Sequence, residues 1–463
     1  MSSNNNDVPE NQRALVLQGG GALGAYEAGA YRVLYESLSK RIRDNENIFD
    51  IIAGTSIGAM NAAVIVSHVV ENRREHPSWT TLKCWEGSVE TLEQFWMNNE
   101  EGLSSTPNIS EWWDEAKKPT RMFTASPEAM RRYYSVKAYL SKDGTPNVCS
   151  LPRLQCGLKF ADPDNTALGL VSDSTPLQET IERFSKHQKN ESSEELRIAT
   201  SWHQRQPRLL VISLDVADGK AVAFDSYHKE AEHDPKNSLY GGDGITINHV
   251  MASGTLPLFY KLREIPTKGG RKFCDGGILS NTPFRELLQA HSDYWRGIVG
   301  EDQDKIPDLD VYMINVHPRK HDNFSTDDYD SVKERIDDIT YSDRNSHYDQ
   351  MVANLVTDYT DLIDKLKKLA KSHFNNKEEG DLFQNEFESF LETTRAKSKG
   401  PSDEDRTYKD LLRGRFRLTD VTRIEYESYE DSIHGKAADF TSETIRSLIQ
   451  KGKEDARRVL RIQ

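Results

Sequence analysis

The chain has 463 residues, enough for two or three domains of ordinary size, and its formal net charge at pH 7 is −14. This acidic balance argues against general nucleic-acid binding, which needs a basic face, and against strong attraction to an anionic membrane without a local basic patch. The longest apolar runs have the length of a strand, and crossing a bilayer takes roughly 20 apolar residues in one helix.

The first residues are polar, and we expect residues 1–12 to form a disordered tail. They show neither the basic start nor the apolar core of a signal peptide. The chain holds four cysteines, whose spacing fits neither a disulfide framework nor a paired zinc site. These features predict a cytoplasmic protein, with peripheral contact to a membrane as an option and no metal or cofactor.

A strand at residues 14–17 leads into three consecutive glycines and then into a helix. Bare backbone N–H groups in such a loop make a cradle for an anion. Gly19, Gly21 and Gly24 also match the G-x-G-x-x-G motif of a dinucleotide site. That site needs a second strand, ending in Asp or Glu about 20 residues later. Residues 40–47 are polar and do not resemble a strand. The next strand delivers Ser56 instead, so we favour an oxyanion hole over a dinucleotide site for this loop.

The next apolar run, from Asp50, ends in Gly54-Thr55-Ser56-Ile57-Gly58 and continues as a helix to about residue 70. Gly-x-Ser-x-Gly between a strand and a helix is the pattern of a nucleophile elbow. Gly54 and Gly58 leave room for the tight turn, and the helix directs its positive dipole end toward Ser56. The pattern indicates a nucleophilic serine.

The regular pattern loosens between about residues 80 and 200, which we interpret as a helical, cap-like insertion. Its aromatic residues favour core packing of short helices, and the alternative is an apolar cap that admits acyl chains to Ser56. These residues are Trp85, Phe95, Trp96, Trp112, Trp113, Phe123, Tyr133 and Tyr134. Strands are predicted at 209–216, 221–224 and 310–316, and a helix at 247–252.

Far downstream, Asp275 is followed by Gly276 and Gly277. By itself Asp-Gly-Gly indicates a β-turn. Together with the glycine loop and the elbow, in this order, it resembles the patatin-like phospholipases. The segment Ala252 to Phe259 also resembles the family's Ala-Ser-x-x-x-Pro stretch, and the resemblance covers roughly residues 13–320.

The resemblance implies an α/β fold, with a three-layer α/β/α core around a mostly parallel sheet. It implies that Ser56 is the nucleophile and that Asp275 is its base in a Ser–Asp dyad. It also implies that the oxyanion is bound by the glycine loop, at Gly19, Gly20, Gly21 and Ala22. Gly54, Gly58, Gly276 and Gly277 then support the two turns. One departure is Leu23, which stands where many members carry Arg or Lys. The implied activity is hydrolysis of acyl esters in phospholipids or other lipids, of the phospholipase or lysophospholipase type, without a metal.

Three alternatives stay open. His317 follows a predicted strand, and the order Ser56, Asp275, His317 is also that of a Ser–Asp–His esterase. An acyltransferase would use the same acyl-serine and pass the acyl group to an alcohol or amine. A non-catalytic lipid-binding scaffold would retain the motifs without the reaction.

Residues 321–463 are strongly charged and are predicted to be helical. One helix carries apolar residues at steps of three and four, the spacing of heptads. They are Val352, Leu355, Tyr359, Leu362, Leu366 and Leu369. A second helix holds Phe383, Phe387 and Phe390, and a last one spans about 442–462. Such stripes favour packing within the chain, and a homodimer through these helices is the alternative.

Overall fold

The structure is a computed structural model. It describes residues 8–98, 100–105, 132–136, 139, 145, 147–148, 174–185, 197–227, 244–257, 260–265, 270–299, 305–320, 329–373, 377–393, 407–409, 415–427 and 435–462. The predictions for residues 1–7, Trp112, Trp113 and Phe123 lie outside this part of the chain. The predicted tail ends earlier than expected, because Asn11 and Gln12 already pair with a neighbouring strand.

An eight-stranded mixed sheet forms the centre of the molecule, in the order β10-β9-β1-β2-β4-β8-β7 with β5 also paired to β4. Its parallel strands are β1 (Asn11–Leu17), β2 (Ile51–Thr55), β4 (Arg208–Asp215), β9 (Asp308–Asn315) and β10 (Leu418–Glu425). The antiparallel strands are β5 (Lys220–Asp225), β7 (Arg263–Glu264) and β8 (Lys272–Asp275). A separate pair joins β3 (Arg197–Ile198) to β6 (Ile245–Thr246). The predicted, mostly parallel sheet is confirmed.

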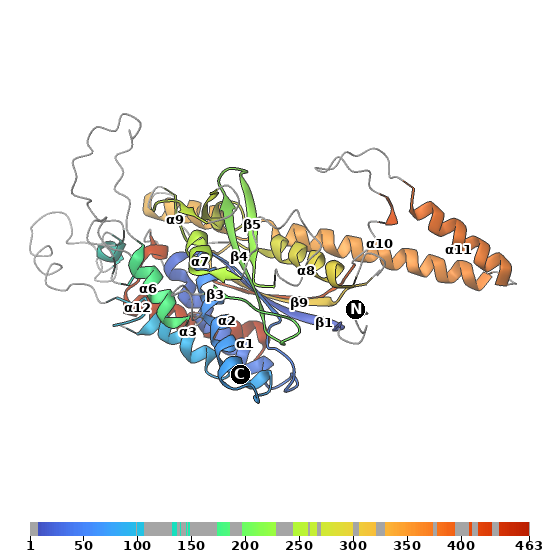
Figure 1. Ribbon diagram of the computed structural model, residues 1–463. Coiled ribbons are helices and arrows are strands. Elements are labelled where there is room, and N and C mark those ends of the chain that lie inside the picture. The colour runs from blue at the N-terminus through green and yellow to red at the C-terminus, as the bar shows by residue number, and fades with distance from the viewer. Residues whose placement is uncertain are drawn as a thin grey trace, which may run out of the picture.

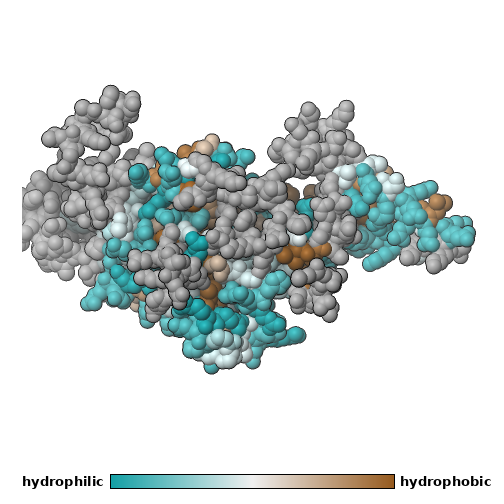
Figure 2. All heavy atoms as spheres, viewed as in Figure 1, coloured by the Kyte–Doolittle hydropathy of each residue, from teal (hydrophilic) through white to brown (hydrophobic). Residues whose placement is uncertain are grey.

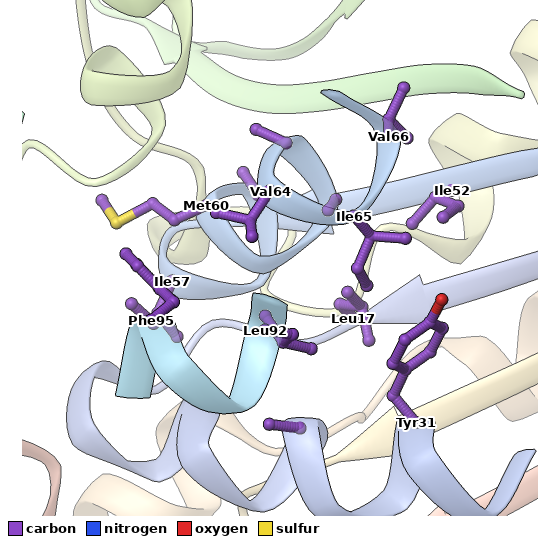
Figure 3. Packing of buried hydrophobic residues seen from close by; sticks show 14 of the residues in the cluster. Leu17, Tyr31, Ile52, Ile57, Met60, Val64, Ile65, Val66, Leu92 and Phe95 are labelled. Atoms are coloured by element: carbon purple, nitrogen blue, oxygen red, sulfur yellow. The ribbon is translucent and has the colours of Figure 1, made fainter. Parts of the chain in front are cut away.

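Helices cover both faces of this sheet (Figure 1). Alternate residues of β1 point to opposite faces, so Leu15 and Leu17 join one apolar cluster while Ala14 and Val16 join another. The first cluster packs under α1 (Gly24–Leu38), α2 (Ile57–Glu75), α3 (Ser88–Met97) and α12 (Ser442–Leu460). Figure 3 shows apolar side chains of α1, α2 and α3 meeting those of β1 and β2 in this cluster. The second cluster packs under α8 (Phe284–Val299). The predicted three-layer α/β/α core is confirmed.

The remaining elements are short or lie outside these layers. They are η1 (Gly21–Leu23), η2 (Leu82–Trp85), α6 (Thr175–Phe184), α7 (Ile247–Ser253), η4 (Gly276–Ile278), α9 (Tyr329–Tyr341), α10 (Ser346–His373), α11 (Lys377–Leu391) and η6 (Lys436–Ala438). Helices α10 and α11 lie side by side and extend away from the sheet (Figure 1).

Three aromatic residues of the region predicted as a cap belong to the main core. Trp85, Phe95 and Trp96 are fully buried, and Trp96 donates a hydrogen bond from Nε1 to Asn61 of α2 at 2.9 Å. An indole N–H inside a core needs such an acceptor. These residues therefore serve core packing, while Tyr133 is exposed.

The chain beyond residue 320 is more closely joined to the core than the sequence predicted. No strand was expected there, yet β10 pairs in parallel with β9 as the edge strand of the central sheet. Its sequence, Leu418-Thr419-Asp420-Val421-Thr422-Arg423-Ile424-Glu425, lacks an apolar run. An edge strand needs only one partner strand and little burial, so charged residues are tolerated in it. Because these residues interrupt any apolar run, the strand could not be predicted from hydrophobicity.

Helix α12 packs against α1 at two glycines. A Cβ atom on Gly29 would lie 1.9 Å from the Ile449 carbonyl oxygen, and one on Gly452 would lie 2.1 Å from the Tyr26 carbonyl oxygen. The two backbones therefore touch where these glycines lie, and the C-terminal helix supports the helix that follows the glycine loop.

We predict that Gly452→Ala destabilises the protein by about 1–3 kcal/mol, because the added methyl group forces the helices apart. The matched control is Gly297→Ala in α8, where an added Cβ would have no atom within 4 Å. That change should be neutral or stabilise by roughly 0.5–1 kcal/mol, since alanine favours helix. Urea unfolding midpoints measure both, and equal midpoints for the two variants would contradict the close crossing.

The apolar stripe of α10, predicted to pack within the chain, is exposed instead. Leu355 is 65% exposed and Leu362 is 53% exposed. The prediction of intramolecular packing is wrong for these residues because α10 turns another face toward α11 and the core. Ile363 lies on that face and packs with Leu391.

Hydrophilic residues predominate among the described residues on the face shown in Figure 2, and hydrophobic residues form small patches. Within the described ranges, none of the helices combines the length and apolarity that crossing a bilayer demands.

Candidate active site

Ser56 lies on a sharp turn between β2 and α2, as the elbow pattern predicts. Its backbone angles are φ 55° and ψ −123°, a conformation that residues other than glycine rarely adopt. A Cβ on Gly54 would lie 2.3 Å from the Gly58 carbonyl oxygen, and one on Gly58 would lie 2.5 Å from the Leu17 carbonyl oxygen. Both glycines are therefore required for the turn to close.

Strand β4 brings Asp275 to this serine. Along one edge, β4 pairs first with β2, up to the pair Thr55 and Ile212. The next residue of β4, Ser213, pairs with Asp275 at the end of antiparallel β8. The other edge of β4 is occupied by β5. Because β2 and β8 meet end to end along β4, the residue after β2 and the last residue of β8 are neighbours in space.

The two side chains form a hydrogen bond. Ser56 Oγ donates to Asp275 Oδ2 at 2.7 Å, and the Gly277 N–H donates to Asp275 Oδ1 at 2.7 Å. Asp275 is only 3% exposed, and its burial raises the pKa of its carboxyl to about 6 although both hydrogen bonds act to lower it. Gly276 has no room for a side chain, because its Cβ would lie 2.6 Å from the Ile212 carbonyl oxygen. This arrangement can accept the serine proton at neutral pH.

The glycine loop lies beside Ser56. A Cβ on Gly19 would be 3.1 Å from the Ser56 Cβ. The Gly19 N–H already donates to the Asn281 carbonyl oxygen at 3.1 Å, and Asn281 Nδ2 donates to the Gly19 carbonyl oxygen at 3.0 Å. Gly19 therefore anchors the loop and does not offer its N–H to a ligand. Within the described residues, no hydrogen bond is recorded for the N–H groups of Gly20, Gly21 and Ala22.

The outer side of the glycine loop rests on the C-terminal part of the chain. A Cβ on Gly21, at φ 56°, would lie 2.3 Å from the carbonyl oxygen of Ala437 in η6. The neighbouring Lys436 is buried, with its Nζ 3.1 Å from Asp338 and 3.2 Å from Glu334 of α9. Burial acts to lower the pKa of Lys436, but these carboxylates raise it overall. Leu23 is buried in the core, so packing and this buried ion cluster hold the loop.

Two polar residues that sequence motifs did not single out, Ser253 and Gln18, support the site. Ser253 Oγ accepts the Ser56 N–H at 2.8 Å and also donates to the Ile212 carbonyl oxygen, so it ties the elbow to β4. Gln18 Oε1 accepts the N–H groups of Val316 and His317 at 2.7 and 2.9 Å. Ser253 stands in the Ala-Ser-x-x-x-Pro stretch, which was the one available signal. Nothing in the sequence pointed to Gln18.

His317 lies near the glycine loop but is not part of the serine–aspartate pair. Its Nδ1 lies 3.2 Å from Asp338 Oδ1, and its ring packs against Tyr341 at 5.7 Å between centroids. Within the described residues, no hydrogen bond joins His317 to Ser56 or Asp275. The geometry therefore gives no support to the Ser–Asp–His alternative.

Among the residues that the structure describes, no group of three or more His, Cys, Asp or Glu side chains is placed to hold a metal ion. The groups that the structure places at Ser56 are a hydroxyl, a buried carboxylate and a loop of backbone N–H donors.

Comparison with known proteins adds the family. Residues 15–288, more than half of the chain, match the family model described as patatin-like phospholipase. A search of curated proteins found no significant match. One similar solved structure is VipD from Legionella pneumophila, with 14% sequence identity, a TM-score of 0.33, and coverage of 98% of this chain and 67% of that one. With the family model matched over the glycine loop, the elbow and the aspartate, the chain belongs to the patatin-like phospholipases, a family of lipid acyl hydrolases.

Proposed function

We propose that the protein hydrolyses acyl esters of phospholipids or lysophospholipids with a Ser56–Asp275 dyad, through an acyl-serine intermediate. The observation that carries the proposal is the 2.7 Å hydrogen bond between Ser56 Oγ and Asp275 Oδ2. A nucleophile needs its base within about 2.6–3.2 Å, and the pair satisfies this although 219 positions separate the residues.

In the first half of the reaction, Ser56 Oγ attacks the ester carbonyl carbon while its proton moves to Asp275 Oδ2. The carbonyl oxygen becomes an oxyanion, to which the N–H groups of Gly20, Gly21 and Ala22 donate in this proposal. The positive end of α2, whose first turn begins at Ser56, favours the same charge. Collapse of the tetrahedral intermediate breaks the ester bond, and the proton on Asp275 leaves with the alcohol.

In the second half, a water molecule gives its proton to Asp275 and attacks the acyl group on Ser56. A second oxyanion forms in the same loop, and its collapse releases the fatty acid and returns the proton to Ser56. Burial of Asp275 supports both halves, because a carboxyl with a pKa of about 6 is a stronger base than an ordinary aspartate and is still ionised at pH 7.

Labelling with a fluorophosphonate ester tests the proposal. The probe phosphonylates serines that are activated in this way, so we expect one adduct, mapped by peptide mass spectrometry to Ser56. The variant Asp275→Asn should react far more slowly, because its side chain cannot take the serine proton. An adduct on another serine, or ester hydrolysis by a protein that the probe leaves unmodified, would refute the assignment.

A further inference from the structure

The exposed stripe on α10 has the pattern of one strand of a coiled coil. Its members are Tyr348, Val352, Leu355, Tyr359, Leu362, Leu366 and Leu369, and each is at least 39% exposed. With Val352, Tyr359 and Leu366 as a positions, the other four residues are d positions, so the repeat runs from Tyr348 to Leu369, just over three heptads. Apolar residues at a and d over this length are typical of helices that pair along a seam.

The sides of α10 outside this stripe already have partners within the chain. Ile363 packs with Leu391 and Phe387 of α11. Thr357 Oγ1 donates to the Phe416 carbonyl oxygen at 3.2 Å, next to β10. Helix α11 and the core therefore cover other sides of α10 and leave its a and d positions exposed to solvent. A contiguous exposed apolar surface of this kind marks an interaction site.

Charge is distributed unevenly along the same helix. All of its acidic residues, Asp349, Asp358, Asp361 and Asp364, precede all of its lysines, which begin at Lys365. Two helices of this kind repel each other when they lie parallel and attract each other when they lie antiparallel.

Only some of these charges are satisfied within the chain. Asp349, Asp361, Asp364 and Lys367 form ion pairs with Arg285, Arg417, Arg415 and Glu388, respectively. Asp358 and Lys365 are exposed, and neither has an ion pair recorded within the described part of the chain. Both occupy g positions, which flank the seam and contact the partner helix in a coiled coil.

We propose that α10 is a homodimerisation element, which pairs with α10 of a second copy of this chain as an antiparallel two-stranded coiled coil. With a positions facing d positions, the layers are Val352 with Leu369, Leu355 with Leu366 and Tyr359 with Leu362, each formed twice across the two-fold axis. The same register places Asp358 beside Lys365 of the partner subunit, also twice. The apolar layers and the charge pairs therefore favour the same antiparallel register. Helix α10 is about 42 Å long at 1.5 Å per residue, which is long enough to contain all of these layers and pairs.

A parallel dimer uses these residues less well. It would set Asp358 beside Ile363 of the partner subunit, an apolar residue that offers no opposite charge. It would also stack Tyr359 on its own copy and align the acidic halves of both helices. The antiparallel register avoids each of these conflicts.

Sedimentation velocity on the full chain tests the proposal through a charge swap. We expect the wild type to dimerise with a dissociation constant of about micromolar or lower. Asp358→Lys and Lys365→Asp should each raise that constant at least about tenfold, because two attractions become repulsions. The double variant Asp358→Lys/Lys365→Asp should restore dimerisation, since opposite charges then face each other again with their positions exchanged. The differences should shrink in 1 M salt.

Leu362→Glu serves as the core variant and should raise the dissociation constant by more than about a hundredfold, because it places charges inside the seam. The matched control is Leu382→Glu on α11, an equally exposed leucine outside the stripe, which should leave dimerisation unchanged. A monomeric wild type at 100 μM overturns the proposal, as does a double variant no better than its single parents. Vesicle binding by a monomer that Leu362→Glu abolishes would assign the stripe to a lipid surface instead.

Discussion

Replacing Ser56 with alanine is expected to lower kcat/KM for a short chromogenic ester by about 10⁴-fold or more. The hydroxyl is the only part of the proposed machinery that forms the covalent bond, so no neighbouring group replaces it. Alanine keeps the backbone hydrogen bond from residue 56 to Ser253, which holds the elbow. We therefore expect the loss to appear in kcat, with the thermal unfolding temperature of the protein unchanged.

Ser372→Ala is the matched control, because Ser372 is an exposed serine near the end of α10. It should retain wild-type activity. The decisive measurement is steady-state hydrolysis by both variants at equal protein concentration. If Ser56→Ala kept more than about a tenth of the wild-type rate, a different nucleophile would have to be sought.

Replacing Asp275 with asparagine is expected to lower kcat/KM by about 10²–10⁴-fold, the range that a general base contributes. The change preserves the shape of the side chain and one acceptor for the Gly277 N–H, but it removes the group that takes the proton. The wild-type pH profile should report the same group. Asp275 works as a base only when ionised, and burial raises its pKa to about 6, so kcat/KM should fall about tenfold per unit as the pH drops below about 6.

The acid limb near pH 6 should be absent from the residual activity of Asp275→Asn. His317→Gln supplies the comparison, because His317 contacts Asp338 and not the serine–aspartate pair. We expect this variant to keep most of the activity and the same acid limb. Loss of activity in His317→Gln as severe as in Ser56→Ala, without loss of fold, would favour the Ser–Asp–His triad.

Much of the site could be predicted from local sequence. The turn around Ser56 depends on Gly54 and Gly58, and the glycine loop depends on residues without a Cβ, so both carry a signature within a few positions. The strands were predictable where they are buried on both faces, as in β4, because such strands are apolar runs. Strand β10 was not predictable in this way, because it lies at the sheet edge and carries charged residues.

The chemical groups of the site follow from local sequence: a serine in a glycine turn, an aspartate before two glycines, and a loop of bare backbone N–H groups. Their distances, and which of these N–H groups have a hydrogen-bond partner among the described residues, depend on long-range pairing. β4 joins β2 to β8 end to end and thereby places Ser56 beside Asp275, while Asn281 takes the Gly19 N–H. The tertiary structure also decided that the α10 stripe faces solvent. The physical reason is that local motifs record backbone sterics, whereas distances and exposure depend on which distant segments pair and pack.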